Sequence, residues 1–355
     1  MTLAPPAAAA RIARERELDA GHRWQAYHVF YGGAPIVLLS ECLLPLADAL
    51  VADGVATEYF TINYWLEGSH VRLRVRVPYG VPEQAVDDRV HREIEAYLAA
   101  SPSLHPMTEL TDNGFYDRLF AGEFTEADRP RYFDAAGRPR FMPNNSVHRR
   151  PYEREWSRYG GPTGMLIAER HFVESTAQAA RLMRLGNLDV RTILLGVASQ
   201  LTFLTAACLL GGDRELVHDF FVAYHRRWVA GYGQGAVYTA DAGRREHAGT
   251  VRAMAERIPP LMDAAARADF DALPSWLADW GRMNARVAAD IREAHRGPGL
   301  TFAYDDGVRL AESATAASWS LAHSLIHMTN NRMMVSVADE AFIAFQIAEA
   351  MGGAR

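Results

Sequence analysis

One stretch near the amino terminus constrains the fold of this chain more strongly than any other. Between His70 and Val77 the sequence HVRLRVRV alternates polar and apolar residues. Successive side chains of a β-strand point to opposite faces of the sheet, so the valines and the leucine form one face and the histidine and arginines the other. The alternation therefore predicts a strand with one face on the core and a cationic opposite face.

The sequence around this strand predicts a β-α-β-β-α order, because extended runs rich in β-branched and aromatic residues alternate with leucines at helical spacing. The expected elements are a strand at 24–31, a helix at 36–54, strands at 57–65 and 70–77 joined by a turn at 66–69, and a helix at 82–97. We expect alternate residues of the strand at 57–65 to share the cationic face and to form a ligand platform with it. These residues are Tyr59, Thr61, Asn63 and Trp65.

Beyond Gly161 the apolar pattern is almost wholly helical. The predicted helices span residues 163–186, 190–211, 213–230, 243–266, 273–296, 314–330 and 335–350. Residues 101–150 are rich in proline and show little periodicity, so we expect an irregular insertion there. The layout predicts an α+β fold, in which a small antiparallel sheet packs with a predominantly helical C-terminal half. We expect a flexible arm over residues 1–22 and a single domain over residues 23–355.

The composition argues against several classes of protein. The 355 residues include 37 Lys and Arg against 43 Asp and Glu, so the net charge of −6 disfavours direct binding to nucleic acid. The only two cysteines, Cys42 and Cys208, lie in apolar stretches, which disfavours a disulfide scaffold. The most apolar stretch, residues 193–210, is interrupted by serine, glutamine and threonine, as in a core helix and not a membrane span. No signal-peptide pattern opens the chain, so we expect a cytoplasmic protein.

Three motifs contain residues suited to chemistry. The strand arginines offer planar guanidinium forks that suit carboxylates. The segment YEREWSRYGG at residues 152–161 leads into a helix whose N-terminus favours an anion. The late segment SLIHMTNNR at residues 324–332 places His327 one helical turn after His323, but Ser324 stands where a zinc HExxH motif needs glutamate, so we expect no metal. Each motif also has a structural interpretation, as a solvated sheet face, a loop with ion pairs, or a core histidine.

Taken together, the three motifs resemble a known family. The strand-turn-strand YFTINYWLEGSHVRLRVRV, the segment YEREWSRYGG followed by AERHFVEST, and SLIHMTNNR are similar to the hallmarks of the carboxy-terminal elimination domain of class I lanthipeptide dehydratases. This domain is also called the thiopeptide-type bacteriocin biosynthesis domain. The resemblance covers about residues 24–350 and implies a carbon–oxygen lyase without a cofactor. Such a lyase expels glutamate from glutamylated serine or threonine of a precursor peptide, leaving dehydroalanine or dehydrobutyrine.

The resemblance also implies roles for individual residues. The essential arginines and histidine of the family fall on Arg74, Arg158 and His327, which are the expected catalytic residues. The expected substrate-binding residues are Asn63, His70, Arg72 and Tyr159. The implied partners are a precursor peptide with leader and core, and a glutamyl-tRNA-dependent glutamylating enzyme acting in trans. A homodimer remains open, and no membrane partner is expected.

Two departures from the family pattern leave alternatives open. Asn63 stands where the family often has arginine, and Ser69 replaces the usual proline before the strand histidine. Relatives with this fold include thiopeptide pyridine synthases, which join two dehydroalanines by a formal [4+2] cycloaddition and release the leader peptide. The chain is therefore also compatible with a pyridine synthase. A third alternative is a non-catalytic module that binds a leader peptide by pairing it to an open sheet edge.

Overall fold

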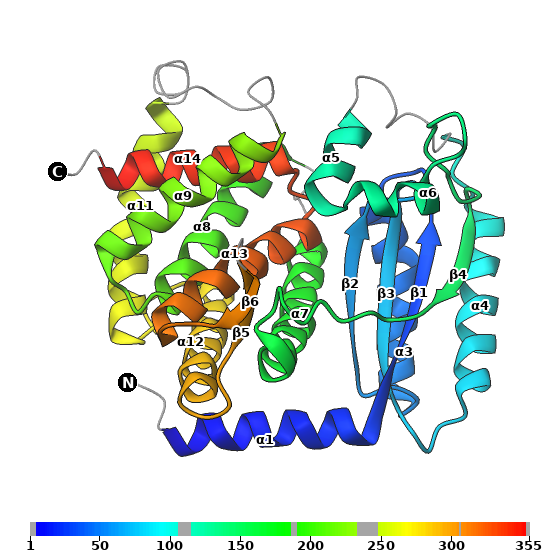
Figure 1. Ribbon diagram of the computed structural model, residues 1–355, viewed down its shortest axis with the longest axis horizontal. Coiled ribbons are helices and arrows are strands. Elements are labelled where there is room, and N and C mark those ends of the chain that lie inside the picture. The colour runs from blue at the N-terminus through cyan, green and yellow to red at the C-terminus, as the bar shows by residue number, and fades with distance from the viewer. Residues whose placement is uncertain (1–4, 106–114, 186–189, 233–247, 305–306, 353–355) are drawn as a thin grey trace. The chain divides into compact units, whose positions relative to one another are not determined.

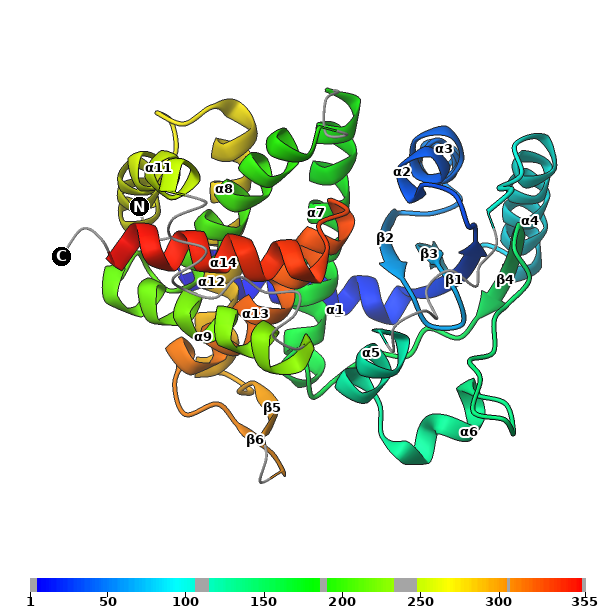
Figure 2. The same ribbon diagram turned by 90° about the horizontal axis from the view of Figure 1, so that it is seen from above.

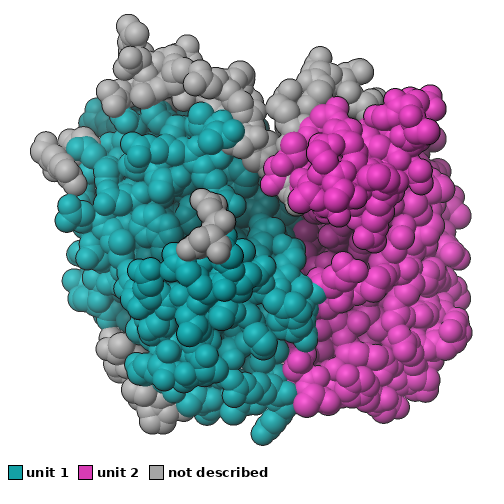
Figure 3. All heavy atoms as spheres, viewed as in Figure 1, with its two compact units in different colours: residues 1–18, 154–355 teal, residues 19–153 magenta. Residues whose placement is uncertain are grey.

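A computed structural model describes the chain except for residues 1–4, 106–114, 186–189, 233–247, 305–306 and 353–355 (Figure 1). The predicted α+β class is confirmed, because a small antiparallel sheet accompanies a large body of helices. Where one domain over residues 23–355 was expected, the chain divides into two compact units (Figure 3). We call residues 19–153 the sheet unit, and residues 1–18 with 154–355 the helical unit.

Among its described residues, the sheet unit contains four antiparallel strands in the order β2-β3-β1-β4 (Figure 1). The strands are β1 (His22–Phe30), β2 (Glu58–Tyr64), β3 (His70–Pro78) and β4 (Ser146–Arg150). On β3 the side chains of Val71, Leu73, Val75 and Val77 are all buried, as the alternation predicts. Helical segments pack against this apolar face (Figure 2): α2 (Pro35–Leu38), η1 (Leu39–Leu43), α3 (Leu44–Ala52) and α4 (Glu83–Ala100). Tyr59 donates a hydrogen bond to Asp48 of α3, and Tyr27 donates one to Asp87 of α4.

The register of the β2–β3 hairpin differs from the expectation by one residue. Tyr64 pairs with His70, so the connection has five residues, in which Glu67 and Gly68 adopt positive φ angles of 63° and 107°. A shift of one residue moves every side chain of a strand to the other face. Asn63 therefore pairs with Val71 on the apolar side, and its expected place beside the arginines is wrong. Tyr59 and Thr61 also lie on the apolar side, so their expected place on the cationic face is wrong. The β2 residues that share the cationic face are Glu58, Phe60, Ile62 and Tyr64.

The segment at residues 101–150 contains more regular structure than its composition indicates. It forms α5 (Phe115–Glu123), η3 (Glu126–Asp128), α6 (Arg129–Tyr132) and the edge strand β4. Tyr116, Phe120 and Phe133 pack with Leu66 of the hairpin connection into a separate small core. This cluster anchors the segment to the turn that precedes β3.

A helix is found at each of the seven positions expected after Gly161, and most ends differ from the expectation by a few residues. The helices are α7 (Gly161–Arg184), α8 (Arg191–Leu209), α9 (Arg214–Tyr232), α11 (Ala248–Arg267), α12 (Ser275–Arg296), α13 (Ala314–Arg332) and α14 (Val337–Gly352). Residues 186 and 243–247, which belong to two of the predicted helices, lie outside the described residues. A hairpin of β5 (Thr301–Tyr304) and β6 (Gly307–Leu310) precedes α13. By length and composition alone, two stretches of the described chain, Pro35–Ala52 and Arg191–Leu209, are able to cross a membrane. The second is 61% buried among other helices, as is typical of a core helix.

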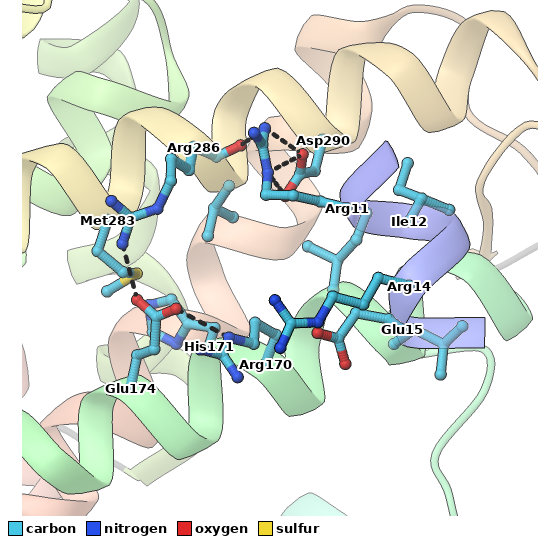
Figure 4. A pocket seen from close by; sticks show the side chains of 13 residues that line it. Arg11, Ile12, Arg14, Glu15, Arg170, His171, Glu174, Met283, Arg286 and Asp290 are labelled. Carbon is cyan, nitrogen blue, oxygen red and sulfur yellow. Dashed lines mark hydrogen bonds and ion pairs between the residues drawn. The ribbon is translucent and has the colours of Figure 1, made fainter. Parts of the chain in front are cut away.

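Helix α1 (Pro5–Gly21) occupies the region where a flexible arm was expected. Alanine is the strongest helix former, and the run of alanines is long enough to extend a helix. Ala8 and Ile12 are buried, and Arg11 Nε donates to Asp290 of α12 at 2.9 Å. A cavity of about 250 Å³ remains where α1 meets α7 and α12 (Figure 4). Its walls carry paired charges, since Arg286 also donates to Glu174.

Candidate active site

The cationic face of β3 is ordered by a neutral histidine. His70 is buried, and its Nδ1 lies 2.9 Å from the carbonyl oxygen of Gly68, which only a protonated nitrogen can satisfy. The other ring nitrogen, Nε2, accepts a hydrogen bond of 3.2 Å from Arg72 Nε. Burial, aided by the charge of Arg72, lowers the pKa of His70 to about 3. His70 is therefore an uncharged acceptor that fixes the Arg72 guanidinium.

Aromatic rings support the two arginines that the sequence predicts to be functional. The guanidinium carbon of Arg72 lies 3.5 Å from the centre of the Tyr64 ring. That of Arg74 lies 4.4 Å from the Tyr152 ring and 5.3 Å from the Phe60 ring. A guanidinium group that stacks on an aromatic ring keeps its N–H groups in its own plane, where they are able to donate hydrogen bonds. We call His70, Arg72 and Arg74 the sheet cluster.

His28 is a member of this face that was missed by the sequence analysis. It lies on β1 directly opposite Arg72, and its ring stacks on His70 at 4.9 Å between centroids. Burial, together with the charge of Arg72, lowers the pKa of His28 far below its usual value, so this ring is also neutral. The signal for it lay in the alternation of Trp24, Ala26, His28 and Phe30, which places these residues on one face of β1.

In the helical unit, the RYGG segment forms a tight entry into α7. Gly160 and Gly161 have φ angles of 87° and 74°, in the region that favours glycine. A β-carbon at Gly164 would lie 2.0 Å from the carbonyl oxygen of Tyr159, so the segment packs directly against the first turn of α7. Tyr159 itself is buried and packs edge to face on Phe172, with ring centres 5.2 Å apart. The three glycines thus fix the backbone conformation next to Arg158.

Arg158 contacts the helix that carries His327. Arg158 Nε donates to Ser324 Oγ of α13 at 3.3 Å, and Arg158 Nη1 pairs with Glu155 at 3.0 Å. Ser324 precedes His327 by three residues, a spacing that places both side chains on one face of a helix. Arg158, which the sequence separates from His327 by 169 positions (327 − 158), thus contacts the same face of α13 that carries His327.

His327 is paired with a carboxylate that was missed by the sequence analysis. Its Nδ1 lies 2.8 Å from Oε1 of Glu340 in the first turn of α14, and Glu340 is only 1% exposed. Tyr224 of α9 donates its hydroxyl to Glu340 Oε2 at 2.5 Å. Burial, reinforced by the charge of Glu340, raises the pKa of Tyr224 well above its usual value, so the hydroxyl stays protonated. We call Arg158, Ser324, His327 and Glu340 the helix cluster.

His323, one turn before His327, has a different environment. Its ring packs against Phe220 at 4.8 Å and Tyr224 at 5.2 Å between centroids. Burial and the charge of Arg227 lower its pKa to about 4. This histidine is a neutral member of an aromatic core, whereas the side chain of His327 keeps 21% of its surface exposed.

The predicted site residues therefore form two clusters. His70, Arg72 and Arg74 lie together in the sheet unit, and Arg158 and His327 lie together in the helical unit.

Residues 24–351 match the family model described as the lantibiotic biosynthesis dehydratase C-terminal domain. The chain belongs to this family. The family resemblance seen in the three motifs is confirmed. Membership of this family supports a role of the protein as an enzyme in the maturation of ribosomally made peptides.

Two of the solved structures that match share this fold along almost the whole chain. The pyridine synthase TbtD from thiomuracin biosynthesis matches with a TM-score of 0.66 at 18% identity, covering 93% of this chain and 98% of TbtD. TsrL matches with a TM-score of 0.58 at 15% identity, covering 94% of this chain and 95% of TsrL. The tRNA-dependent lantibiotic dehydratase MibB from Microbispora sp. 107891 matches with a TM-score of 0.49 at 16% identity, covering 94% of this chain and 28% of MibB. No curated protein sequence matches significantly.

Proposed function

We propose that this protein is a carbon–oxygen lyase that eliminates glutamate from O-glutamylated serine or threonine of a ribosomally made precursor peptide. The observation that carries the proposal is the helix cluster, in which His327 is paired with a buried carboxylate beside the serine that accepts from Arg158. A β-elimination needs a base for the α-proton and cations for the departing carboxylate. An imidazole and a guanidinium are the residue types suited to these two tasks.

His327 acts as the base in this proposal. Nε2 of His327 takes the proton from the α-carbon of the modified residue, and the electron pair left on that carbon forms the new double bond to the β-carbon. The bond from the β-carbon to the ester oxygen breaks, and glutamate leaves with that electron pair as a carboxylate. The imidazolium then returns its proton to solvent. General base catalysis of this kind contributes about 10²–10⁴-fold to the rate.

Arg74 and Arg158 bind the carboxylates of the glutamyl group. A guanidinium offers two parallel N–H donors to a carboxylate, and each charge-assisted hydrogen bond contributes about 1.5–3 kcal/mol. Negative charge grows on the leaving oxygen as the ester bond breaks, so a guanidinium held there stabilises the transition state more than the ground state. Arg72, fixed by His70, adds a further cation to the sheet cluster.

The decisive experiment supplies purified protein with a precursor peptide that a glutamylating enzyme has already modified. Loss of the glutamyl group and appearance of dehydroalanine or dehydrobutyrine, followed by mass spectrometry, is the expected result. His327→Gln is expected to leave the glutamylated peptide intact, whereas His218→Gln, a change beside Asp219 in the second turn of α9, is expected to behave like the wild type. Intact glutamylated peptide with the wild-type protein would contradict the proposal.

A second candidate is a pyridine synthase, and the end-to-end match with TbtD favours it. That activity is tested with a precursor that already carries two dehydroalanines, where release of the leader and formation of a six-membered nitrogen ring are the signature. Turnover here, with no turnover of the glutamylated peptide, selects the second candidate. Peptide that binds but stays unchanged in both assays selects a non-catalytic leader-binding module.

A further inference from the structure

We infer that Glu340 is the positioning residue for His327: it holds the proton of the imidazole on Nδ1 and leaves Nε2 as the proton acceptor. The choice of His327 as the base rests on the proposed function. The tautomer assigned to His327 rests on geometry alone, so the two claims fail in different experiments.

The argument begins with the hydrogen bond between the two side chains. A neutral imidazole carries one proton, and an ionised carboxylate has no proton to give. A ring nitrogen 2.8 Å from a carboxylate oxygen is therefore the nitrogen that carries the hydrogen, and in His327 this is Nδ1. The lone pair then lies on Nε2, at the far side of the ring, where a base needs it.

Two features of the surroundings of Glu340 suit a carboxylate that accepts hydrogen bonds. The Tyr224 hydroxyl donates to one carboxylate oxygen, and Nδ1 of His327 lies within hydrogen-bond distance of the other. Glu340 also lies in the first turn of α14, where the helix dipole favours negative charge. Ser336 and Asp339 cap this end of the helix through hydrogen bonds in both directions, which fixes where the turn begins.

Three helices thus meet at one carboxylate, and each contributes one polar group. α9 supplies Tyr224, α13 supplies His327, and α14 supplies Glu340. The ring of Trp228, also from α9, lies 5.1 Å from the His327 ring between centroids and covers part of it. A buried carboxylate oxygen without a donor is costly, so Oε1 of Glu340 favours an imidazole that presents Nδ1–H.

The first test reads the tautomer directly. Protein labelled with ¹⁵N-histidine gives two ring-nitrogen signals per histidine in long-range ¹H–¹⁵N spectra, and His327→Gln assigns the pair that belongs to His327. The wild type is expected to show the Nδ1–H form. Glu340→Met, which removes the acceptor at similar size, is expected to shift His327 towards the Nε2–H form. Glu340→Gln keeps a carbonyl acceptor and is expected to retain Nδ1–H.

The second test follows turnover of glutamylated peptide by the same variants. Glu340→Met is expected to lower kcat about 10²–10⁴-fold with little change in KM, because the base then carries its proton on the wrong nitrogen. Glu340→Gln is expected to recover most of that loss. Added to His327→Gln, Glu340→Met is expected to lower the rate no further. Tyr224→Phe, which keeps the ring and removes one donor to Glu340, is expected to cause a smaller fall.

The outcomes separate the inference from the proposed function. An Nε2–H form of His327 in the wild type overturns the role of Glu340, and so does an Nδ1–H form that persists in Glu340→Met. If Glu340→Met does not fold, the wild-type spectrum still decides, because an Nε2–H form of His327 there overturns the role of Glu340. A wild-type protein that shows the expected tautomer but does not release glutamate refutes only the proposed lyase activity.

Discussion

Arg74 and Arg76 lie two positions apart on β3 and face the same side of the sheet, but their neighbours differ. Arg76 is 1% exposed and forms an ion pair of 2.7 Å with Glu58 on the adjacent strand. The guanidinium of Arg74 lies over the rings of Phe60 and Tyr152 in the sheet unit. The ion pair gives Arg76 a role in the fold, whereas the proposed function assigns Arg74 to binding the glutamyl carboxylates.

Arg74→Lys tests the second of these roles. Lysine keeps the charge and loses the planar fork, so we expect turnover of glutamylated peptide to fall at least about tenfold, the equivalent of one charge-assisted hydrogen bond. Steady-state kinetics measure the effect, and Arg89→Lys on α4 is the matched control because Arg89 binds only surface carboxylates among its described contacts. Wild-type kinetics in Arg74→Lys would remove Arg74 from the mechanism.

Arg76→Met tests the structural role. The change leaves the Glu58 carboxylate, which is 12% exposed, without its closest cation. Removing one partner of a buried ion pair costs about 3–5 kcal/mol, because the remaining charge is still desolvated. We expect the free energy of unfolding of the sheet unit to fall by about 3 kcal/mol in urea titration. Arg76→Met combined with Glu58→Leu is expected to recover most of the loss, and no recovery would contradict the ion-pair explanation.

At the scale of elements, a buried histidine lies where α7 packs against α12, and its burial disfavours the protonated form. His171 is fully buried and packs against Trp280 with ring centres 5.5 Å apart. Burial, with a smaller contribution from Arg332, lowers the pKa of His171 to about 3. The unfolded chain protonates this residue near its ordinary pKa of about 6.5. Between these values the unfolded state binds more protons than the folded state, so stability falls as the pH drops from about 6.5 towards 3.

We therefore predict that His171→Leu flattens the acid dependence of stability. The contribution of His171 is complete above about pH 6.5 and declines below it by up to about 1.4 kcal/mol per pH unit. Thermal unfolding at pH 7 and pH 5 is expected to show a smaller drop in Tm for His171→Leu than for the wild type. The exposed His105 provides the control, since His105→Leu is expected to keep the wild-type drop. Equal drops in all three proteins would contradict the assignment.

An element or site residue was predictable where the pattern that specifies it lies within its own stretch of sequence. The helices from α7 to α14 were predictable because their apolar periodicity extends over many turns. The five-residue strand β4 has a single buried residue, Val147, so no alternation distinguishes it from a loop. The face of Asn63 depended on the length of one turn, which composition does not determine. Glu340 was missed because its partner lies on another helix, and packing of three helices creates the pairing.

At the scale of the whole molecule, the residues assigned by the family resemblance are divided between two compact units. Arg74 belongs to the sheet unit and His327 to the helical unit, whereas the family model runs through both, over residues 24–351. The family therefore includes both units. The proposed elimination requires that Arg74 and His327 act on one substrate molecule in one chemical step.

A double-variant cycle tests this requirement. Arg74 stabilises the leaving carboxylate only if the α-proton is being removed, so its contribution depends on the base. Residues that act as a unit show strongly non-additive losses, and we expect Arg74→Lys combined with His327→Gln to be hardly slower than His327→Gln alone. The measured quantity is kcat/KM for glutamylated peptide in the four proteins. A double variant whose loss equals the product of the two single losses would show that the residues contribute independently, and would separate the sheet cluster from the chemical step.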